Sequence, residues 1–571
     1  MRTMKGIPAS PGIQQAPAWK YESDDIEVSR APVGDPSSEW QRLTHALERA
    51  RSQVAEIHIR ALSEVGSSEA AIFEAHRMFL EDPALLARAR QGIFQSEISA
   101  EAAWAEGFEY YAAKLEGLGD ELLRARAADV RDVGALVLRI LLGRERSSKP
   151  SPSAPSIVIA RDLTPSDTIG LDRAFVRGFA TMEGGPTSHT AILAKALQLP
   201  AVVGLGQRLF EVDDGALVLI DGERGEIVVE PDVAAAEAFA RRSKEVQRIE
   251  QEASEHAEEP AQTTDGHRVE VVANIGRVEE ARAAIGLGAE GVGLLRTEFL
   301  YLERSYAPSE EEQLHAYGEI LDAFESRPVV VRTLDAGGDK ELRYLDPTPE
   351  ANPFLGWRAI RLCLDRPDLF KTQLRALLRA SVGHDLRIMF PMVAILDEVR
   401  RAKNLLYEAR KEVEAAGHRT ASAIQVGIMV EVPAVAVMAD QFAREVDFLS
   451  IGTNDLTQYT MAAERTNQRV AYLGDACHPA VLRQIRGVIK AGHQAGIWVG
   501  LCGELAGDPQ GIPILLGLGL DEFSMAPGFI PHAKALIRKW SFAGARELAA
   551  LALDLDSAPA VRAAVATSSP A

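Results

Sequence analysis

Residues 446–455 read Val446-Asp-Phe-Leu-Ser-Ile-Gly-Thr-Asn-Asp455, an apolar run that stops at a glycine and continues in polar residues. The run Val446–Ile451 is typical of a buried β-strand. Seven similar runs alternate with helical patterns beyond Gly266: Val269–Ile275, Gly291–Leu295, Pro328–Val331, Leu386–Met389, Val426–Val430, Ile497–Leu501 and Glu522–Met525. Eight strand and helix units over about 300 residues predict a (β/α)8 TIM barrel, with an open doubly wound sheet as the alternative.

Polar side chains follow five of these predicted strands directly. They are Arg296-Thr-Glu298, Arg332-Thr-Leu-Asp335, Glu431, Gly452-Thr-Asn-Asp455 and Cys502-Gly-Glu504. Buried parallel strands need no charges for stability, and barrel enzymes carry their catalytic groups where the strands end. The recurrence therefore predicts an active site at the carboxyl ends of the strands.

Basic residues in this half could hold a small anion with more than one negative charge. An arginine guanidinium matches the geometry of phosphate and carboxylate with paired hydrogen bonds. The candidates are Arg296, Arg332, Arg358 and Arg465, with Lys340 following the Gly337-Gly-Asp339 turn. For any single arginine, a surface ion pair is the alternative.

Two acidic strand ends suggest a metal site. Glu431 and Asp455 could place hard oxygen ligands on a Mg²⁺ ion that keeps some waters and binds substrate oxygens. The alternative is that both carboxylates pair with the arginines named above.

One of the three cysteines is a candidate for chemistry. Cys502 follows an apolar run and precedes Gly503, so we expect its thiol at the barrel mouth, where it could donate or accept a proton. Cys363 fits a small buried hydrophobic residue, and Cys477 has no motif around it.

A second candidate site precedes the barrel. Gly184-Gly-Pro-Thr-Ser-His-Thr190 runs into the helical pattern Ala191–Leu197, which places His189 at a helix start where free N–H groups favour an anion. The imidazole could carry a phosphoryl group, although a surface or core histidine is the alternative. Together with the barrel site, this histidine predicts phosphoryl transfer. The sequence contains no Walker A motif, so ATP is not the expected donor.

The remaining patterns predict a multidomain α/β chain. Residues 1–30 offer one or two short strands and join residues 145–230 in an α/β domain that carries His189. A helical domain, 31–144, is inserted there, and a linker rich in serine and proline, Arg144–Ser156, follows it. A solvated helix, 231–260, leads to the barrel, 261–571, whose last residues, Ser557–Ala571, are expected to form a loose tail.

Composition narrows the possible partners and the location. The formal net charge of −20 argues against nucleic acid or an anionic membrane and suits a basic protein partner. The cysteines form no C-x-x-C pair, no apolar run approaches a membrane span, and the N-terminus lacks the apolar core of a signal peptide. We therefore expect a cytoplasmic protein without an anchor.

Several long motifs resemble one known family. Gly184-Gly-Pro-Thr-Ser-His-Thr-Ala-Ile-Leu-Ala194 resembles the phosphohistidine signature of phosphoenolpyruvate-utilising enzymes. Leu295-Arg-Thr-Glu-Phe-Leu300, Ser450-Ile-Gly-Thr-Asn-Asp-Leu-Thr-Gln-Tyr459 and Leu501-Cys-Gly-Glu-Leu-Ala-Gly-Asp508 are similar to segments of enzyme I of the phosphotransferase system. The resemblance covers nearly the whole chain.

This resemblance implies roles for the candidate residues. Phosphoenolpyruvate and Mg²⁺ would bind in the barrel, His189 would take the phosphoryl group, and Cys502 would protonate the enolate to give pyruvate. Glu431 and Asp455 would hold the metal. The substrate would be held by Arg296, Arg332, Asn454 and Arg465, with lesser weight on Lys340 and Arg358.

The resemblance also implies partners. Phosphohistidine would pass its group to the small carrier protein HPr, docked on the helical domain, where residues 73–82 mix acidic and apolar side chains. A homodimer through the barrel is implied as well. The alternatives are a phosphoenolpyruvate synthase or pyruvate phosphate dikinase-like enzyme, which would need a nucleotide-binding domain, and a non-catalytic phosphoenolpyruvate sensor, which would be expected to lack His189 or Cys502.

Overall fold

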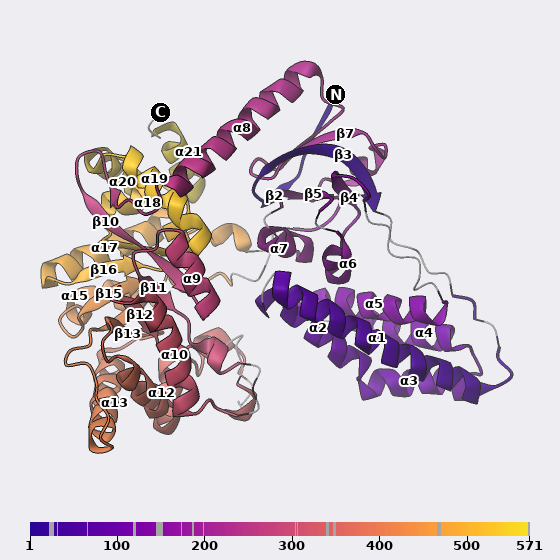
Figure 1. Cartoon of the computed structure of the whole chain (residues 1–571), viewed down its shortest axis with the longest axis horizontal. Helices are drawn as coiled ribbons and strands as arrows, with labels where there is room; N and C mark the ends of the chain where they lie inside the picture. Colours follow the sequence, from indigo (N-terminus) through magenta and orange to yellow (C-terminus); the bar gives the residue numbers. More distant parts are fainter. Residues whose placement is uncertain are drawn as a thin grey trace. The chain divides into compact units, whose positions relative to one another are not determined.

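The chain forms two compact units, Met1–Gln247 and Arg248–Ala571, in a computed structural model. The structure describes all residues except 22–27, 31, 65–66, 118–120, 144–151, 173, 186–187, 198, 303, 305, 338–341, 346–349, 465–466, 468–469 and 569–571. Figure 1 shows the helices and strands of each unit.

The first unit contains one mixed sheet of eight strands in the order β1-β8-β7-β3-β4-β5-β6-β2. The strands are β1 (Arg2–Lys5), β2 (Ile7–Ser10), β3 (Ile13–Tyr21), β4 (Ser156–Ala160), β5 (Val176–Thr181), β6 (Ala201–Val203), β7 (Leu217–Asp221) and β8 (Glu226–Val229). Residues from both sides of the helical segments therefore share this sheet. Two short helices connect strands of this sheet: α6 (Pro165–Gly170) lies between β4 and β5, and α7 (His189–Ala196) lies between β5 and β6.

The expectation of one or two strands near the N-terminus was wrong, because three form there. The longest, β3, lies inside the sheet and pairs parallel with β4 and antiparallel with β7. Its sequence contains two glutamines and Pro17, so local propensity is weak. The side chains of Ile13, Ala16 and Ala18 are buried in the folded unit. This burial, rather than local propensity, stabilises the strand conformation of β3.

Five helices follow β3, where the sequence predicts a helical domain: α1 (Pro36–Glu64), α2 (Ser67–Leu80), α3 (Pro83–Gln95), α4 (Ala100–Glu116) and α5 (Glu121–Leu141). The α3 start is fixed locally, because Asp82 accepts hydrogen bonds from the N–H groups of Ala84 and Leu85. Ile169 of α6 and Leu193 of α7 belong to the same apolar core as these helices. The helical part thus packs against the part of the unit that carries α7.

The second unit contains a closed parallel barrel. Its strands are β10 (Arg268–Ile275), β11 (Val292–Leu295), β12 (Val329–Arg332), β13 (Leu386–Phe390), β14 (Val426–Val430), β15 (Phe448–Ile451), β16 (Trp498–Leu501) and β17 (Glu522–Met525). Each strand pairs with the next, and β17 pairs with β10 through Glu270 opposite Glu522. This closure confirms the TIM barrel and excludes the open sheet.

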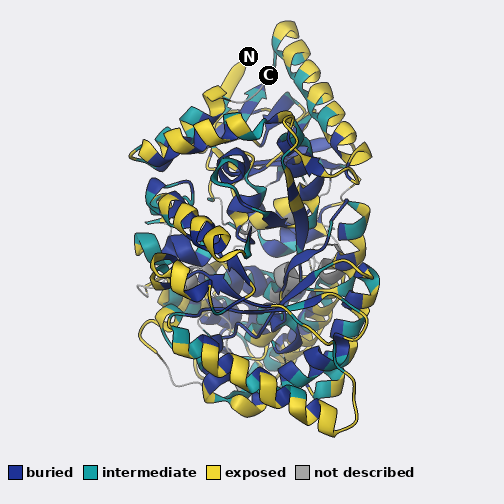
Figure 2. Cartoon of the chain, turned by 90° about the vertical axis from the view of Figure 1, so that its left-hand side faces the viewer, coloured by how far each residue is buried: buried dark blue, intermediate teal, exposed yellow. Residues whose placement is uncertain are grey.

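The barrel strands alternate between two apolar cores. Outward side chains, such as Val271 and Phe523, pack under the helices, while inward side chains, such as Val330 and Met429, fill the barrel. Figure 2 shows the strands dark blue and the helices yellow along their outer sides. The helices are α9 (Val278–Gly286), α10 (Glu310–Phe324), α11 (Ile360–Asp365), α12 (Pro367–Ala380), α13 (Leu396–Ala415), α14 (Pro433–Val437), α15 (Ala439–Phe442), α16 (Thr453–Met461), α17 (Pro479–Ala495), α18 (Gly511–Leu518), α19 (Ile530–Lys539), α20 (Phe542–Asp554) and α21 (Ala558–Ser568).

The C-terminal segment is not the loose tail that we expected, because residues 558–568 form α21. Its alanines favour a helix, and Val561 and Val565, one turn apart, are buried. Arg562 on the same helix bonds Asp475 at 2.6 Å and Asp508 at 2.9 Å. The helix therefore belongs to the fold of the second unit.

One long helix, α8 (Val233–Glu255), spans the boundary between the units, as predicted for residues 231–260. Within the first unit, Arg242 pairs with Asp221 at 2.7 Å and with Glu223 at 3.1 Å. Within the second unit, the buried Lys534 donates hydrogen bonds to the carbonyls of Ala257, at 3.0 Å, and Gly288, at 2.7 Å. No helix in the described part of the chain is long and apolar enough to cross a membrane.

Candidate active site at the barrel mouth

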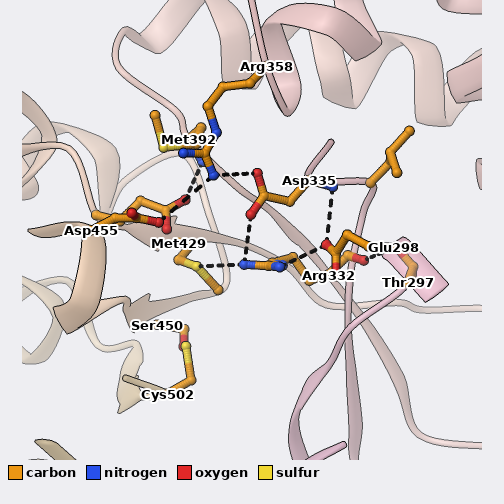
Figure 3. A network of polar contacts seen from close by, with 12 residues as sticks. Thr297, Glu298, Arg332, Asp335, Arg358, Met392, Met429, Ser450, Asp455 and Cys502 are labelled. Carbon is orange, nitrogen blue, oxygen red and sulfur yellow. Dashed lines mark hydrogen bonds and ion pairs between the residues drawn. The ribbon is translucent and has the colours of Figure 1, made fainter. Parts of the chain in front are cut away.

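The carboxyl ends of β11 and β12 meet in a buried ionic network. Arg332, the last residue of β12, donates a hydrogen bond to Glu298 at 2.7 Å and pairs with Asp335 at 3.1 Å. Its guanidinium also lies 3.8 Å from the sulfur of Met429 (Figure 3). The Nε atom of Arg332 is buried and has no hydrogen-bond partner within the described residues. The described residues therefore leave this donor unsatisfied.

A second arginine extends this network. Arg358 is 3% exposed and bonds Asp335 at 2.9 Å, and it lies 3.9 Å from Asp455. Its Nε is also buried without a partner among the residues described. Asp335 thus holds both guanidinium groups, which fixes two cations side by side (Figure 3).

Backbone geometry places Arg358. Gly337 has a φ of +107°, and a Cβ there would lie 2.5 Å from the Cβ of Arg358. Ala359 also lies in the left-handed region, with a φ of +53°, and its N–H donates to Ala336 at 2.8 Å. The loop after β12 therefore folds tightly onto the segment that carries the arginine.

Two carboxylates face the same mouth. Glu431, directly after β14, is 1% exposed and accepts a 2.5 Å hydrogen bond from the N–H of Met392. Burial raises the pKa of Glu431 to about 8, the charges of Asp455 and Asp335 add to this, and Arg332 opposes it. Asp455, in the first turn of α16, has a buried Oδ1 with no partner in the described part of the chain.

These carboxylates fit a divalent cation. Both supply hard oxygen ligands, and the Oδ1 of Asp455 has no partner among the described residues. Among the described residues, no group of three or more histidine, cysteine, aspartate or glutamate side chains is arranged to hold a metal. A metal on two carboxylates would leave its other positions for water and substrate oxygens.

Cys502 follows β16 and lies on the inner side of the barrel, 6% exposed. Ser450 donates a hydrogen bond to its Sγ over 3.4 Å (Figure 3). Burial raises the pKa of Cys502 to about 11, and the bond from Ser450 and the nearby Arg332 oppose this shift. The thiol therefore keeps its proton at neutral pH, as a proton donor must.

The other two cysteines belong to the outer apolar core, as expected for Cys363. Burial raises the pKa of both thiols, to about 12 for Cys477, with Arg562 opposing that shift. All three cysteines are free.

The remaining predicted barrel residues are placed less completely. Arg296 is exposed directly after β11. The side-chain amide of Asn454 donates a hydrogen bond to the carboxylate of Glu504 at 3.1 Å, and its Oδ1 accepts one from the N–H of Glu504 at 3.0 Å. These two bonds tie the loops after β15 and β16 together. Lys340 and Arg465 lie outside the described residues. The residues brought together are thus Arg332, Arg358, Glu431 and Asp455.

His189 is the first residue of α7, in the other unit. Ser188 caps this helix by accepting a hydrogen bond from the N–H of Ala191 at 3.4 Å, and the buried Thr190 donates to Asp162 at 3.2 Å. Gly184 has a φ of +101°, which favours glycine. Pro186, Thr187 and the His189 side chain lie outside the described residues. The predicted helix start is confirmed.

Sequence reasoning missed several neighbours of the site. Glu298 and Asp335 were noted only as polar strand ends, yet they hold the arginines. Asn274 is a polar residue near the carboxyl end of β10. The rule that polar residues at strand ends mark the site could therefore have identified it. The N–H of Met392, at a φ of +55°, has no sequence signal.

Two comparisons with known proteins agree on the family. Residues 5–126 match "PEP-utilising enzyme, N-terminal", 152–225 match "PEP-utilising enzyme, mobile domain", and 250–542 match "PEP-utilising enzyme, PEP-binding domain". The phosphoenolpyruvate-protein phosphotransferase of Geobacillus stearothermophilus is 48% identical over 563 residues, 98% of this chain and 97% of that protein. Its namesake in Bacillus subtilis is 46% identical over 541 residues, 95% of each chain. A multiphosphoryl transfer protein of Rhodobacter capsulatus is 47% identical over 98% of this chain and 67% of that protein.

Proposed function

The chain belongs to the phosphoenolpyruvate-protein phosphotransferase family, and we propose that His189 carries the phosphoryl group from the barrel mouth to an HPr-type carrier. The chain is an enzyme that uses phosphoenolpyruvate as its substrate and a phosphocarrier protein as its partner. The assignment of individual residues to this reaction is our proposal.

The observation that carries the proposal is the pair of buried arginines that share Asp335. Phosphoenolpyruvate bears a phosphate and a carboxylate, and Arg332 and Arg358 each keep a buried Nε without a partner in the described part of the chain. Guanidinium groups bind both kinds of oxyanion through parallel hydrogen bonds. Arg296, Asn454, Arg465 and Lys340 complete the proposed substrate site.

Glu431 and Asp455 are the proposed ligands of Mg²⁺. Glu298 and Asp335 already pair with Arg332 and Arg358, whereas Asp455 keeps a buried Oδ1 without a partner among the residues described. A bound Mg²⁺ would neutralise charge on the substrate oxygens. Glu431 and Asp455 have the oxygen donors that this ion prefers.

The chemistry follows from the side chains of the chain. A nitrogen of the His189 imidazole forms a bond to phosphorus while the bond from phosphorus to the enol oxygen breaks, and the enolate leaves with that electron pair. The thiol of Cys502 then gives its proton to the enolate carbon, which yields pyruvate, and the thiolate regains a proton from solvent. The buried arginines hold the substrate oxygens throughout.

The carrier is proposed to dock on the helical part of the first unit. At the α2 and α3 corner, Met78 is 51% exposed and lies near Glu74, Glu81 and Asp82 in the sequence. Acidic and apolar groups of this kind, on a chain with a net charge of −20, suit a basic carrier.

We also propose a homodimer through the barrel unit, where Val437 and Tyr472 are each 78% exposed. The three free cysteines suit the cytoplasm.

Labelled phosphoenolpyruvate with Mg²⁺ tests the carrier histidine. The protein should acquire label that is labile in acid and stable in base, because a phosphoryl group on nitrogen has that stability. His189→Ala should abolish the label, while the control His315→Ala, on the exposed face of α10, should retain it. Label that survives His189→Ala would remove this histidine from the pathway, and labelling by ATP would favour a dikinase-like enzyme.

A further inference from the structure

The polar end of β10 reaches past the neighbouring strand β17 to Cys502, which follows β16. Asn274 donates one hydrogen bond from its Nδ2 to the carbonyl of Cys502 at 2.9 Å, and another to the carbonyl of Ser524 at 3.2 Å. The hydroxyl of Ser524 donates to Oδ1 of Asn274 at 2.5 Å. These bonds join three consecutive strands of the barrel, β10, β17 and β16.

This arrangement determines the orientation of the amide. Two carbonyls accept from Nδ2 and one hydroxyl donates to Oδ1, so a flipped amide would set its oxygen against both carbonyls. The Cys502 carbonyl lies past the end of β16, so the ladder of strand hydrogen bonds does not supply this partner. The side chain of Asn274 supplies it instead.

The opposite side of Cys502 is held as well. Its N–H donates to Ile451 at 3.0 Å, and the hydroxyl of Ser450 lies 3.4 Å from Sγ. Gly503, the next residue, packs directly against Thr453, so a larger residue there would displace the loop. The backbone of Cys502 is thus fixed from β10, through Asn274, and from β15, through Ile451.

We propose that Asn274, supported by Ser524, is a positioning residue that aims the Cys502 thiol at one face of the enolate. This rests on the proposed role of Cys502 as proton donor. A donor fixed on one side adds its proton to one face of the enolate carbon, whereas enolate that escapes to solvent is protonated on both faces. Neither Asn274 nor Ser524 needs to touch the substrate.

Two variants test this inference. Asn274→Ala removes both hydrogen bonds to the carbonyls, and Ser524→Ala removes only the hydroxyl that orients the amide. Ser381→Ala is the matched control, because Ser381 is also a buried hydroxyl with two hydrogen bonds, to Leu378 and from Ala421, at residues the site does not use. If Asn274→Ala does not fold, Ser524→Ala decides the question by itself.

The decisive measurement is the handedness of the pyruvate methyl group. Phosphoenolpyruvate with deuterium on one side of C3, turned over in tritiated water, should give a methyl group of single handedness with the unmodified enzyme and with Ser381→Ala. Asn274→Ala should give mixed handedness and about tenfold slower pyruvate formation, while KM for phosphoenolpyruvate changes little, since a positioned acid contributes roughly 10²–10⁴-fold. Ser524→Ala should show the same defects to a smaller extent.

Pyruvate of single handedness from both Asn274→Ala and Ser524→Ala would overturn the inference, whatever their rates. Failure of the underlying proposal is recognised separately. If Cys502→Ala itself makes pyruvate of single handedness at the normal rate, then Cys502 is not the donor, and the positioning role falls with it.

Discussion

Single residues decide where the cations of the mouth lie, and Gly337 is the clearest case. Its φ of +107° belongs to the left-handed side of backbone space, and the space that a Cβ would need is filled by Arg358. Side chains that approach so closely tolerate no added methyl group without movement. The position of Arg358 is therefore set by the lack of a side chain at Gly337.

Gly337→Ala should raise KM for phosphoenolpyruvate about tenfold or more with a smaller change in kcat, because Arg358 is displaced from Asp335 and the substrate. Gly383→Ala is the matched control. Gly383 has a φ of +88° but open space around it, so the alanine should lower thermal stability without changing KM. Steady-state kinetics and thermal unfolding of both variants make the comparison, and equal KM values would contradict the steric argument.

Glu522, the first residue of β17, is a second instructive residue because it carries a buried carboxyl that the proposed chemistry does not use. Its Oε1 is buried without a hydrogen-bond partner among the residues described, and it lies over Gly500. Burial raises the pKa of Glu522 to about 8, the charge of Glu270 adds to this, and Arg387 opposes it. The folded protein therefore prefers the protonated acid.

This preference gives a pH dependence with a definite sign. In the unfolded chain glutamate has a pKa of about 4.3, so the folded state binds the extra proton between about pH 4.3 and 8, and this group lowers stability as the pH rises through that range. Glu522→Gln should raise the melting temperature by a few degrees at pH 8.5 and by less at pH 5.5. Exposed Glu414→Gln should change it little at either pH. A gain from Glu522→Gln that is equal at both pH values would contradict the argument.

Elements were predictable where one local pattern sufficed. All eight barrel strands follow from apolar runs, and the rule that polar residues follow strand ends located Arg332, Glu431, Asp455 and Cys502. The number of strands near the N-terminus was underestimated and α21 was missed, because burial against distant partners outweighs the weak local signals of β3 and α21.

The network inside the site could not be predicted in the same way. Which carboxylate meets which arginine depends on strand register and barrel closure, which bring Asp335 between Arg332 and Arg358. The reach of Asn274 to Cys502 likewise requires that β10 and β16 flank β17. Left-handed residues such as Met392 and Ala359 depend on the surrounding packing and leave no local signal.

For the whole molecule, charge separates the two half-reactions. The net charge is −20, and exposed Met78 on the helical part lies near Glu74, Glu81 and Asp82 in the sequence, whereas the arginines at the barrel mouth, Arg332 and Arg358, are buried. Attraction between exposed opposite charges is screened by salt over a Debye length of about 10 Å at 0.1 M, and buried contacts are screened much less. Salt should therefore act unequally on the two steps.

Raising the ionic strength from about 50 to 500 mM should lower kcat/KM for a basic HPr-type carrier by about tenfold, because steered association depends on exposed charge. The rate at which phosphoenolpyruvate labels the protein in a single turnover should change much less. Glu81→Gln together with Asp82→Asn should flatten the salt dependence of the carrier step, whereas Glu414→Gln, on α13 of the other unit, should not. A carrier step that is insensitive to salt, or equally sensitive in the double variant, would place the docking surface elsewhere than the acidic corner of α2 and α3.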